Sequence, residues 1–211
     1  MSSLPRRQTR LQPRHRLVAL SVFATLWFAH PNALLAATMP QGNPRLMQGP
    51  MVGAVREDGM QIWVRLSGPF PSFVEYSREA DFSHSLKTPS LTAAKRDDYI
   101  LKFALTDLKP ASQVYYRVWV AGRLDPTTST GAPFVVNTAP AGPARFRVAF
   151  GSCAKLRGQA VDAIWATIPP WNPNLFFWLG DNIYGDALDP DILAEEYRRL
   201  RDASGLARIW G

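Results

Sequence analysis

The sequence has little cysteine and little histidine: of 211 residues, one is cysteine and three are histidine. The single cysteine, Cys153, excludes an internal disulfide, so the fold does not depend on cystine cross-links. His15 and His30 lie in the first 30 residues and His84 lies before the middle of the chain. A zinc site built from several His and Cys ligands is therefore disfavoured. The same holds for a hydrolase in which Cys153 is the nucleophile and histidine the base.

An excess of one charge is also missing once the first 37 residues are set aside. Those residues contain five arginines and no acid, so 19 of the 24 basic residues remain against 17 acidic ones, and the net charge falls from +7 to +2 (19 − 17). Because the basic and acidic residues are nearly equal in number, the sequence does not require a basic surface patch. We therefore expect no nucleic-acid partner.

The first 37 residues have the order of a signal peptide: arginines, then the apolar stretch 17–29, then HPNALLAATMP. Thirteen apolar residues fall short of the roughly 20 that a membrane-spanning helix needs. We expect residues 1–37 to be a signal peptide and the protein to be exported, periplasmic or extracellular, without membrane association after cleavage. An uncleaved anchor is the alternative. The sequence leaves open twin-arginine or general secretory export, since Arg6-Arg7 suits the former but Thr9-Arg10 does not.

Residues 45–138 form short runs of period two, separated by clusters of Gly, Pro, Ser and Asp, which predicts antiparallel strands of a β-sandwich. LKPASQVYYRV resembles the corner of a fibronectin-type-III domain, although Val114 stands at the usual tyrosine position. The expected core-facing residues are Ile62, Val64 and Leu66 in one run and Tyr99, Leu101, Phe103 and Leu105 in another.

After a linker at residues 139–145, residues 146–211 change to the order strand, helix, strand, which predicts parallel pairing and the start of an α/β domain. The fold class is therefore mixed. NLFFWLG is apolar on both faces, as in a parallel sheet covered by helices. The expected inner stripe of the first helix is Val161, Ile164, Trp165 and Ile168.

LDPDILAEEYRRLRDAS predicts a surface helix that begins at Pro190 with Asp189 as its cap. Glu195 can pair with Arg199 one turn later. The expected inward residues are Leu193, Tyr197 and Leu200.

Residues that follow two parallel strands emerge at the same edge of a sheet, where ligands bind in open α/β folds. FGSC ends one strand and WLGDNIYGD ends the next, so we expect Cys153, Asp181 and Tyr184 to converge. A thiolate, a carboxylate and a phenolate together suit a metal ion, and tyrosinate suits ferric iron. Taken singly, Cys153 is also compatible with packing and GDxxYGD with a strand-exit turn.

FGSC, a helix and WLGDNIYGD, following a fibronectin-like module, resemble the alkaline phosphatase D (PhoD-like) family of exported metallophosphatases over roughly residues 45–211. The resemblance implies a phosphoric monoester and diester hydrolase with ferric iron and calcium. By motif, Cys153 and Tyr184 would bind iron and Asp181 would bridge the metals. Catalytic residues beyond these ligands are not identified.

Members of that family continue past this point with further Asp, Asn and His ligands. The resemblance therefore implies a partial α/β domain, a truncated and inactive chain, and possibly a complementing C-terminal half as partner. The alternative is a non-catalytic binding module, in which the sandwich binds a polymer or protein and the α/β part is inert. An exposed aromatic row on the sandwich would favour that alternative.

Overall fold

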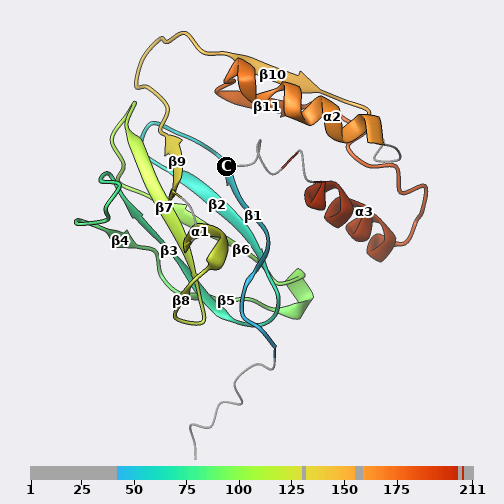
Figure 1. The fold of residues 1–211 in the computed structure, drawn as a ribbon, viewed down its shortest axis with the longest axis horizontal. Coiled ribbons are helices and arrows are strands. Elements are labelled where there is room, and N and C mark those ends of the chain that lie inside the picture. Colours follow the sequence, from blue (N-terminus) through green and yellow to red (C-terminus); the bar gives the residue numbers. More distant parts are fainter. Residues whose placement is uncertain (1–41, 130–131, 155–158, 204–205, 207–211) are drawn as a thin grey trace, which may run out of the picture. The chain divides into compact units, whose positions relative to one another are not determined.

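The computed structural model describes residues 42–129, 132–154, 159–203 and 206 (Figure 1). The expected signal peptide, residues 1–37, lies outside the described residues. Within the described part of the chain, no helix has the length and apolar character needed to cross a membrane.

Two antiparallel sheets form the N-terminal sandwich, as the period-two runs predicted. The first sheet has the order β1-β2-β6, with β1 at Leu46–Gly53, β2 at Met60–Leu66 and β6 at Ile100–Leu105. The second has the order β4-β3-β7-β8, with β5 beside β3 and β9 beside β7. Its strands are β3 Pro71–Ser77, β4 Leu86–Lys87, β5 Leu91–Thr92, β7 Gln113–Val120, β8 Arg123–Leu124 and β9 Phe134–Asn137. Two short helical turns, η2 (Lys95–Asp97) and α1 (Pro126–Ser129), connect strands.

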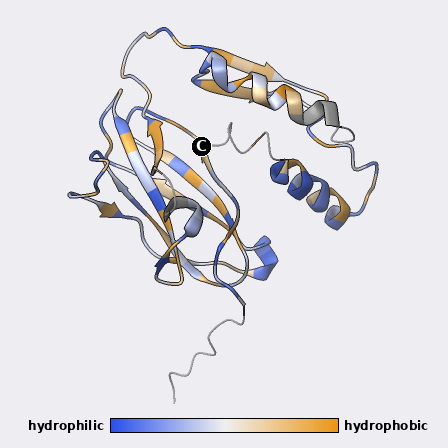
Figure 2. Ribbon diagram, in the orientation of Figure 1, coloured by the Kyte–Doolittle hydropathy of each residue, from blue (hydrophilic) through white to orange (hydrophobic). Residues whose placement is uncertain are grey.

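The core lies between the inner faces of these two sheets and follows the predicted alternation. Figure 2 shows hydrophobic and hydrophilic residues mixed along the strands, and in β2 and β6 the face that alternation makes apolar is the buried one. The predicted core residues of β2 and β6 are buried: Ile62, Val64, Leu66, Leu101, Phe103 and Leu105. Tyr99, which was also predicted to face the core, is partly exposed and packs against it.

The tyrosine corner of a fibronectin-type-III domain is replaced here by an apolar contact. Val114, at the usual tyrosine position, is buried in the core. Tyr115 donates its hydroxyl proton to Gln113 on its own strand. Tyr116 stacks on Phe134 at 5.4 Å, and burial raises the pKa of its phenol. The sandwich is therefore held at this point by packing.

The α/β part contains β10 (Val148–Gly151), α2 (Gln159–Thr167), η3 (Pro169–Trp171), β11 (Leu175–Trp178) and α3 (Pro190–Asp202). Strands β10 and β11 pair in parallel, as predicted, with Val148 opposite Leu175 and Gly151 opposite Trp178. The crossover through α2 is what a parallel pair requires.

Only one face of the β10–β11 sheet is covered, which corrects the expectation of a strand buried on both faces. Trp165 of α2 packs against Phe176 and Trp178, with ring centroids 6.3 and 5.4 Å away. On the other face four apolar side chains are exposed: Val148, Phe150, Leu175 and Phe177. Ile164, predicted to share the inner stripe of α2, is 57% exposed, because the two-stranded sheet is narrow and Trp165 occupies the contact.

Helix α3 begins as predicted. Asp189 accepts a hydrogen bond from the backbone N–H of Asp191, and Pro190 occupies the first turn. Glu195 lies 3.5 Å from Arg199. Of the predicted inward residues, Leu200 is buried and Leu193 half-buried, whereas Tyr197 is exposed, since its ring lies beside the Arg201 guanidinium rather than in the core.

The Asp189 cap permits a first prediction. Replacing Asp189 by alanine removes the side-chain acceptor for the N–H of Asp191, so α3 should lose about 1 kcal/mol of stability. Hydrogen exchange of the first turn of α3 measures this loss. The Asp189→Asn variant keeps an acceptor and should stay close to wild type. Equal exchange in the alanine variant and wild type would contradict the cap.

Candidate metal centre

The ends of β10 and β11 are tied together by backbone hydrogen bonds. Leu179 N–H donates to the Gly151 carbonyl at 2.9 Å, and Cys153 N–H donates to the Gly180 carbonyl at 3.3 Å. These bonds continue the parallel ladder beyond the strands and bring the two chain segments to one edge of the sheet.

Asp181 stands between the other two predicted ligands. Its Oδ2 atom is 3.6 Å from the Cys153 Sγ atom and 3.3 Å from the Tyr184 hydroxyl oxygen. All three side chains are exposed at the sheet edge. The predicted convergence of Cys153, Asp181 and Tyr184 is therefore confirmed, and their role as metal ligands stays a prediction.

Two of the three residues have a left-handed backbone. The φ angles are +58° at Cys153 and +48° at Asp181, next to Gly180 at +119°. A residue with a Cβ atom in this region costs of the order of 1–3 kcal/mol, and such residues cluster at functional sites. Gly180 adopts a conformation that L-residues rarely reach. The turn is therefore locally unfavourable in energy, and it directs the Cys153 and Asp181 side chains toward each other.

The hydrogen bond with Cys153, together with lost hydration and the adjacent Asp181 charge, raises the pKa of Tyr184 to about 12. The phenol is therefore protonated near neutral pH, and its hydroxyl donates a hydrogen bond to Asp181. Sulfur, carboxylate and phenol donors in one place would be mutually repulsive if all were charged, and a trivalent cation would offset that repulsion. The donor set thus fits ferric iron.

Asn182 adds an oxygen donor that sequence reasoning passed over. Its Oδ1 atom is buried and has no hydrogen-bond partner among the described residues. An uncharged amide oxygen is a ligand that calcium accepts, so the loop also has an unused hard donor. Within the described residues, no three His, Cys, Asp or Glu side chains cluster as metal ligands.

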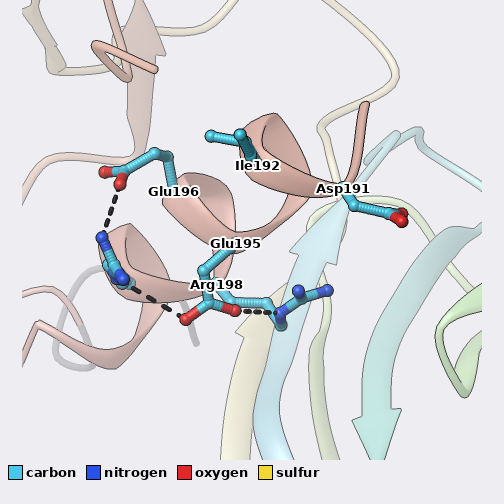
Figure 3. Close-up of a pocket in the computed structure, with 6 residues that line it drawn as sticks. Asp191, Ile192, Glu195, Glu196 and Arg198 are labelled. Atoms are coloured by element: carbon cyan, nitrogen blue, oxygen red, sulfur yellow. Dashed lines mark hydrogen bonds and ion pairs between the residues drawn. The ribbon is translucent and has the colours of Figure 1, made fainter. Parts of the chain in front are cut away.

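A hollow of about 350 Å³ lies on α3 and shares no residue with this cluster. Figure 3 shows Arg198 paired with Glu195, and Arg199 contacts Glu195 and Glu196. Their charges are compensated along the helix.

The aromatic side chains of the sandwich face do not form an open row. Phe73 and Trp119 stack with centroids 5.7 Å apart. Lys87 lies 5.4 Å from the Phe73 centroid, and Arg117 lies 4.0 Å from that of Phe82. These rings are only partly exposed and lie close to cations, so an open aromatic row is not seen among the residues that the structure describes. Cys153, for its part, faces a carboxylate and a phenol, which does not favour the cysteine-nucleophile alternative.

Comparison with known proteins bears on the fold. Residues 32–133 match the family described as PhoD-like phosphatase, N-terminal domain. The solved structure of PhoD superposes with a TM-score of 0.62 at 18% identity, covering 76% of this chain and 36% of that chain. This likeness shows the fold, and the chain spans 36% of the length of the solved PhoD chain.

Smaller solved domains match about half of the chain. The sensor domain of the anti-sigma factor RsgI4 of Pseudobacteroides cellulosolvens has a TM-score of 0.36 at 13% identity, covering 47% of this chain and 97% of that chain. The FN5 domain of Drosophila Lar has a TM-score of 0.33 at 15% identity, covering 49% and 100%. No curated protein matches the chain in sequence.

Proposed function

We propose that this chain, whose residues 32–133 match the family described as PhoD-like phosphatase, N-terminal domain, is part of an exported metal-dependent phosphoric ester hydrolase. The substrates proposed are phosphate monoesters and diesters, and the proposed location is the periplasm or the exterior of the cell. The single observation that carries the proposal is the convergence of Cys153 and Tyr184 on the Asp181 carboxylate.

In this proposal Cys153 and Tyr184 would hold ferric iron, and Asp181 would be a ligand of both iron and calcium. A carboxylate has two oxygens, so one Asp181 side chain can contact two cations. When bound, ferric iron and calcium supply the positive charge that stabilises a phosphoryl group during transfer. The strand ends keep the three donors at an exposed edge, where a phosphate ester can approach.

Binding of ferric iron would release protons from this cluster. The pKa of Tyr184, raised to about 12, keeps the phenol protonated in the metal-free protein at neutral pH, whereas the ligand form is the phenolate. Iron must therefore compete with this proton, so its apparent affinity should rise as pH rises from 6 to 8.

The experiment is a titration of the full chain with ferric ion, read by the visible absorption of an iron–phenolate pair. Colour is expected in the wild type and should disappear in Tyr184→Phe, which keeps packing and removes the phenolate oxygen. Tyr115→Phe is the matched control, because the Tyr115 hydroxyl contacts only Gln113 among the described residues. Colour that persists in Tyr184→Phe would refute the assignment.

Turnover by this chain alone is a separate matter. Cys153, Asp181 and Tyr184 fill only part of the coordination shells of two cations, so hydrolysis of a chromogenic phosphodiester should stay at background after loading with iron and calcium. Robust turnover that disappears in Cys153→Ala would instead show that these 211 residues are catalytically sufficient.

A further inference from the structure

A chain of ion pairs connects the sandwich to α3. Arg65 donates from both Nε and Nη2 to the two oxygens of the Asp98 carboxylate, each at 2.9 Å. Arg198 Nη1 of α3 donates to the same carboxylate at 3.0 Å, and Arg198 Nε donates to Glu195 at 2.8 Å. Arg65, Asp98 and Arg198 are largely shielded from water. Partly buried bidentate pairs of this kind are stronger than surface ion pairs.

Asp98 is also held by contacts within the sandwich. Its backbone ends the turn η2, with its N–H bonded to the Lys95 carbonyl and a left-handed φ of +51°. Hydrogen bonds from Arg65, opposed by burial and reinforced by Arg198, keep the pKa of the Asp98 carboxyl below its usual value. The carboxylate is thus charged and correctly oriented for Arg198 across the neutral pH range.

Two further contacts hold α3 against the outer face of the β1-β2-β6 sheet. Gln48 of β1 donates from Nε2 to the Arg198 carbonyl at 2.8 Å and to Asp202 at 2.6 Å. The Arg201 guanidinium lies 4.8 Å from the ring centroid of Trp63 on β2. Gln48 itself is buried, so these contacts are shielded from water.

The other side of α3 touches the loop that bears the candidate ligands. A Cβ atom placed on Gly185 would lie 2.5 Å from Leu193 Cδ2 and 3.9 Å from Glu196 Cγ. The backbone of Gly185, the residue after Tyr184, therefore lies directly on α3. One helix thus contacts both the sandwich and the loop 180–186.

We propose that α3, anchored on the sandwich by the Asp98–Arg198 ion pair, holds loop 180–186 in place. Asp98 and Arg198 are therefore positioning residues for Asp181 and Tyr184. The functional meaning of this inference rests on the proposed metal site. Loop 180–186 has its start fixed by β11 and its end fixed by α3, so releasing α3 frees the end that carries Tyr184. Ligands that must first be ordered bind a metal more weakly than ligands already in place.

The first test is hydrogen–deuterium exchange of the full chain without metal, comparing wild type with Arg198→Met. Methionine keeps an apolar stem and removes both ion pairs. Exchange of the amides in 180–187 is expected to rise about tenfold together with that of α3, while β2 and β7 keep their protection. Arg198→Lys, which retains a charge near Asp98, should recover part of the protection.

Arg199→Met is the matched control. Arg199 lies one position away on the same helix and pairs with Glu196 at 2.6 Å, so its loss removes an ion pair within α3. Loop exchange in this variant should equal that of wild type. Faster exchange in α3 with unchanged exchange in 180–187 for Arg198→Met would overturn the proposal. If Arg198→Met also unfolds the sandwich, the Gln48→Leu variant replaces it. Faster exchange in α3 with unchanged exchange in 180–187 would again overturn the proposal.

The second readout is the dissociation constant of ferric ion, which should rise about tenfold in Arg198→Met and stay unchanged in Arg199→Met. Failure of the wild type to bind ferric ion would refute the proposed metal site while the metal-free exchange result still decides the positioning role. Wild-type affinity in Arg198→Met, despite a mobile loop, would refute the positioning role while the metal site stands.

Discussion

Replacing Glu75 by glutamine is expected to remove about 3 kcal/mol from the free energy of unfolding, because it breaks a buried ion pair and leaves its partner uncompensated. Glu75 on β3 is 5% exposed. Its carboxylate accepts hydrogen bonds from Arg117 at 2.8 Å, Trp119 Nε1 at 2.7 Å and Ser85 at 2.7 Å. One side chain thus joins β3 to β7 and to the segment before β4.

The effect should depend on pH. Burial of Glu75 disfavours its charge, but hydrogen bonds from Arg117, Ser85 and Trp119 outweigh burial and lower the pKa below the ordinary 4.5. A carboxyl whose folded-state pKa is lowered stabilises the fold above its unfolded value, and that contribution is lost as pH falls through the folded-state pKa. The difference between wild type and Glu75→Gln should therefore be full at pH 6 and shrink as pH falls below 4.5.

Urea unfolding at several pH values measures this difference. Glu57→Gln is the control: Glu57 is an exposed glutamate of the same sandwich, and its loss should change stability by less than about 0.5 kcal/mol. A difference between wild type and Glu75→Gln that is constant from pH 6 to pH 2 would show that packing, not the charge of Glu75, holds the two strands.

Exposed phenylalanines on β10 and β11 are expected to make the purified chain self-associate. Phe150 is 69% and Phe177 51% exposed, and the two lie opposite each other in the parallel register. Burying a phenylalanine contributes about 1.5–3 kcal/mol, and 1.4 kcal/mol is about tenfold in affinity. The double variant Phe150→Ser/Phe177→Ser should therefore raise the dissociation constant of self-association about 100-fold or more. In the purified protein, these two rings can be buried only against a second copy of the chain.

Sedimentation velocity over a concentration series measures the association. Phe176→Ser is the matched control, because Phe176 precedes Phe177 but faces Trp165 and Trp178 on the covered side. This control should lower stability and leave the association as strong as in wild type or stronger. Association that is equally strong in the Phe150/Phe177 double variant would place the contact on another surface.

Much of the fold was predictable because strands and helices leave local periodicities in the sequence. Alternation in β2 identified Ile62, Val64 and Leu66 as core, and the strand, helix, strand order identified β10 and β11 as parallel. The convergence of the candidate ligands followed from that direction alone. The exposure of Ile164 and Tyr197 was not predictable, because periodicity shows which residues share a face and not which element covers it.

The sequence by itself determined which residues share a face, the direction of the two parallel strands and hence the meeting of Cys153, Asp181 and Tyr184 at one edge. Only the tertiary structure decided that Glu75 pairs with Arg117, 42 residues away, and that Asp98 pairs with Arg198, 100 residues away. The physical reason is range: strand and helix periods are set by neighbouring residues, whereas a charged side chain finds its partner only after the chain has brought distant segments together.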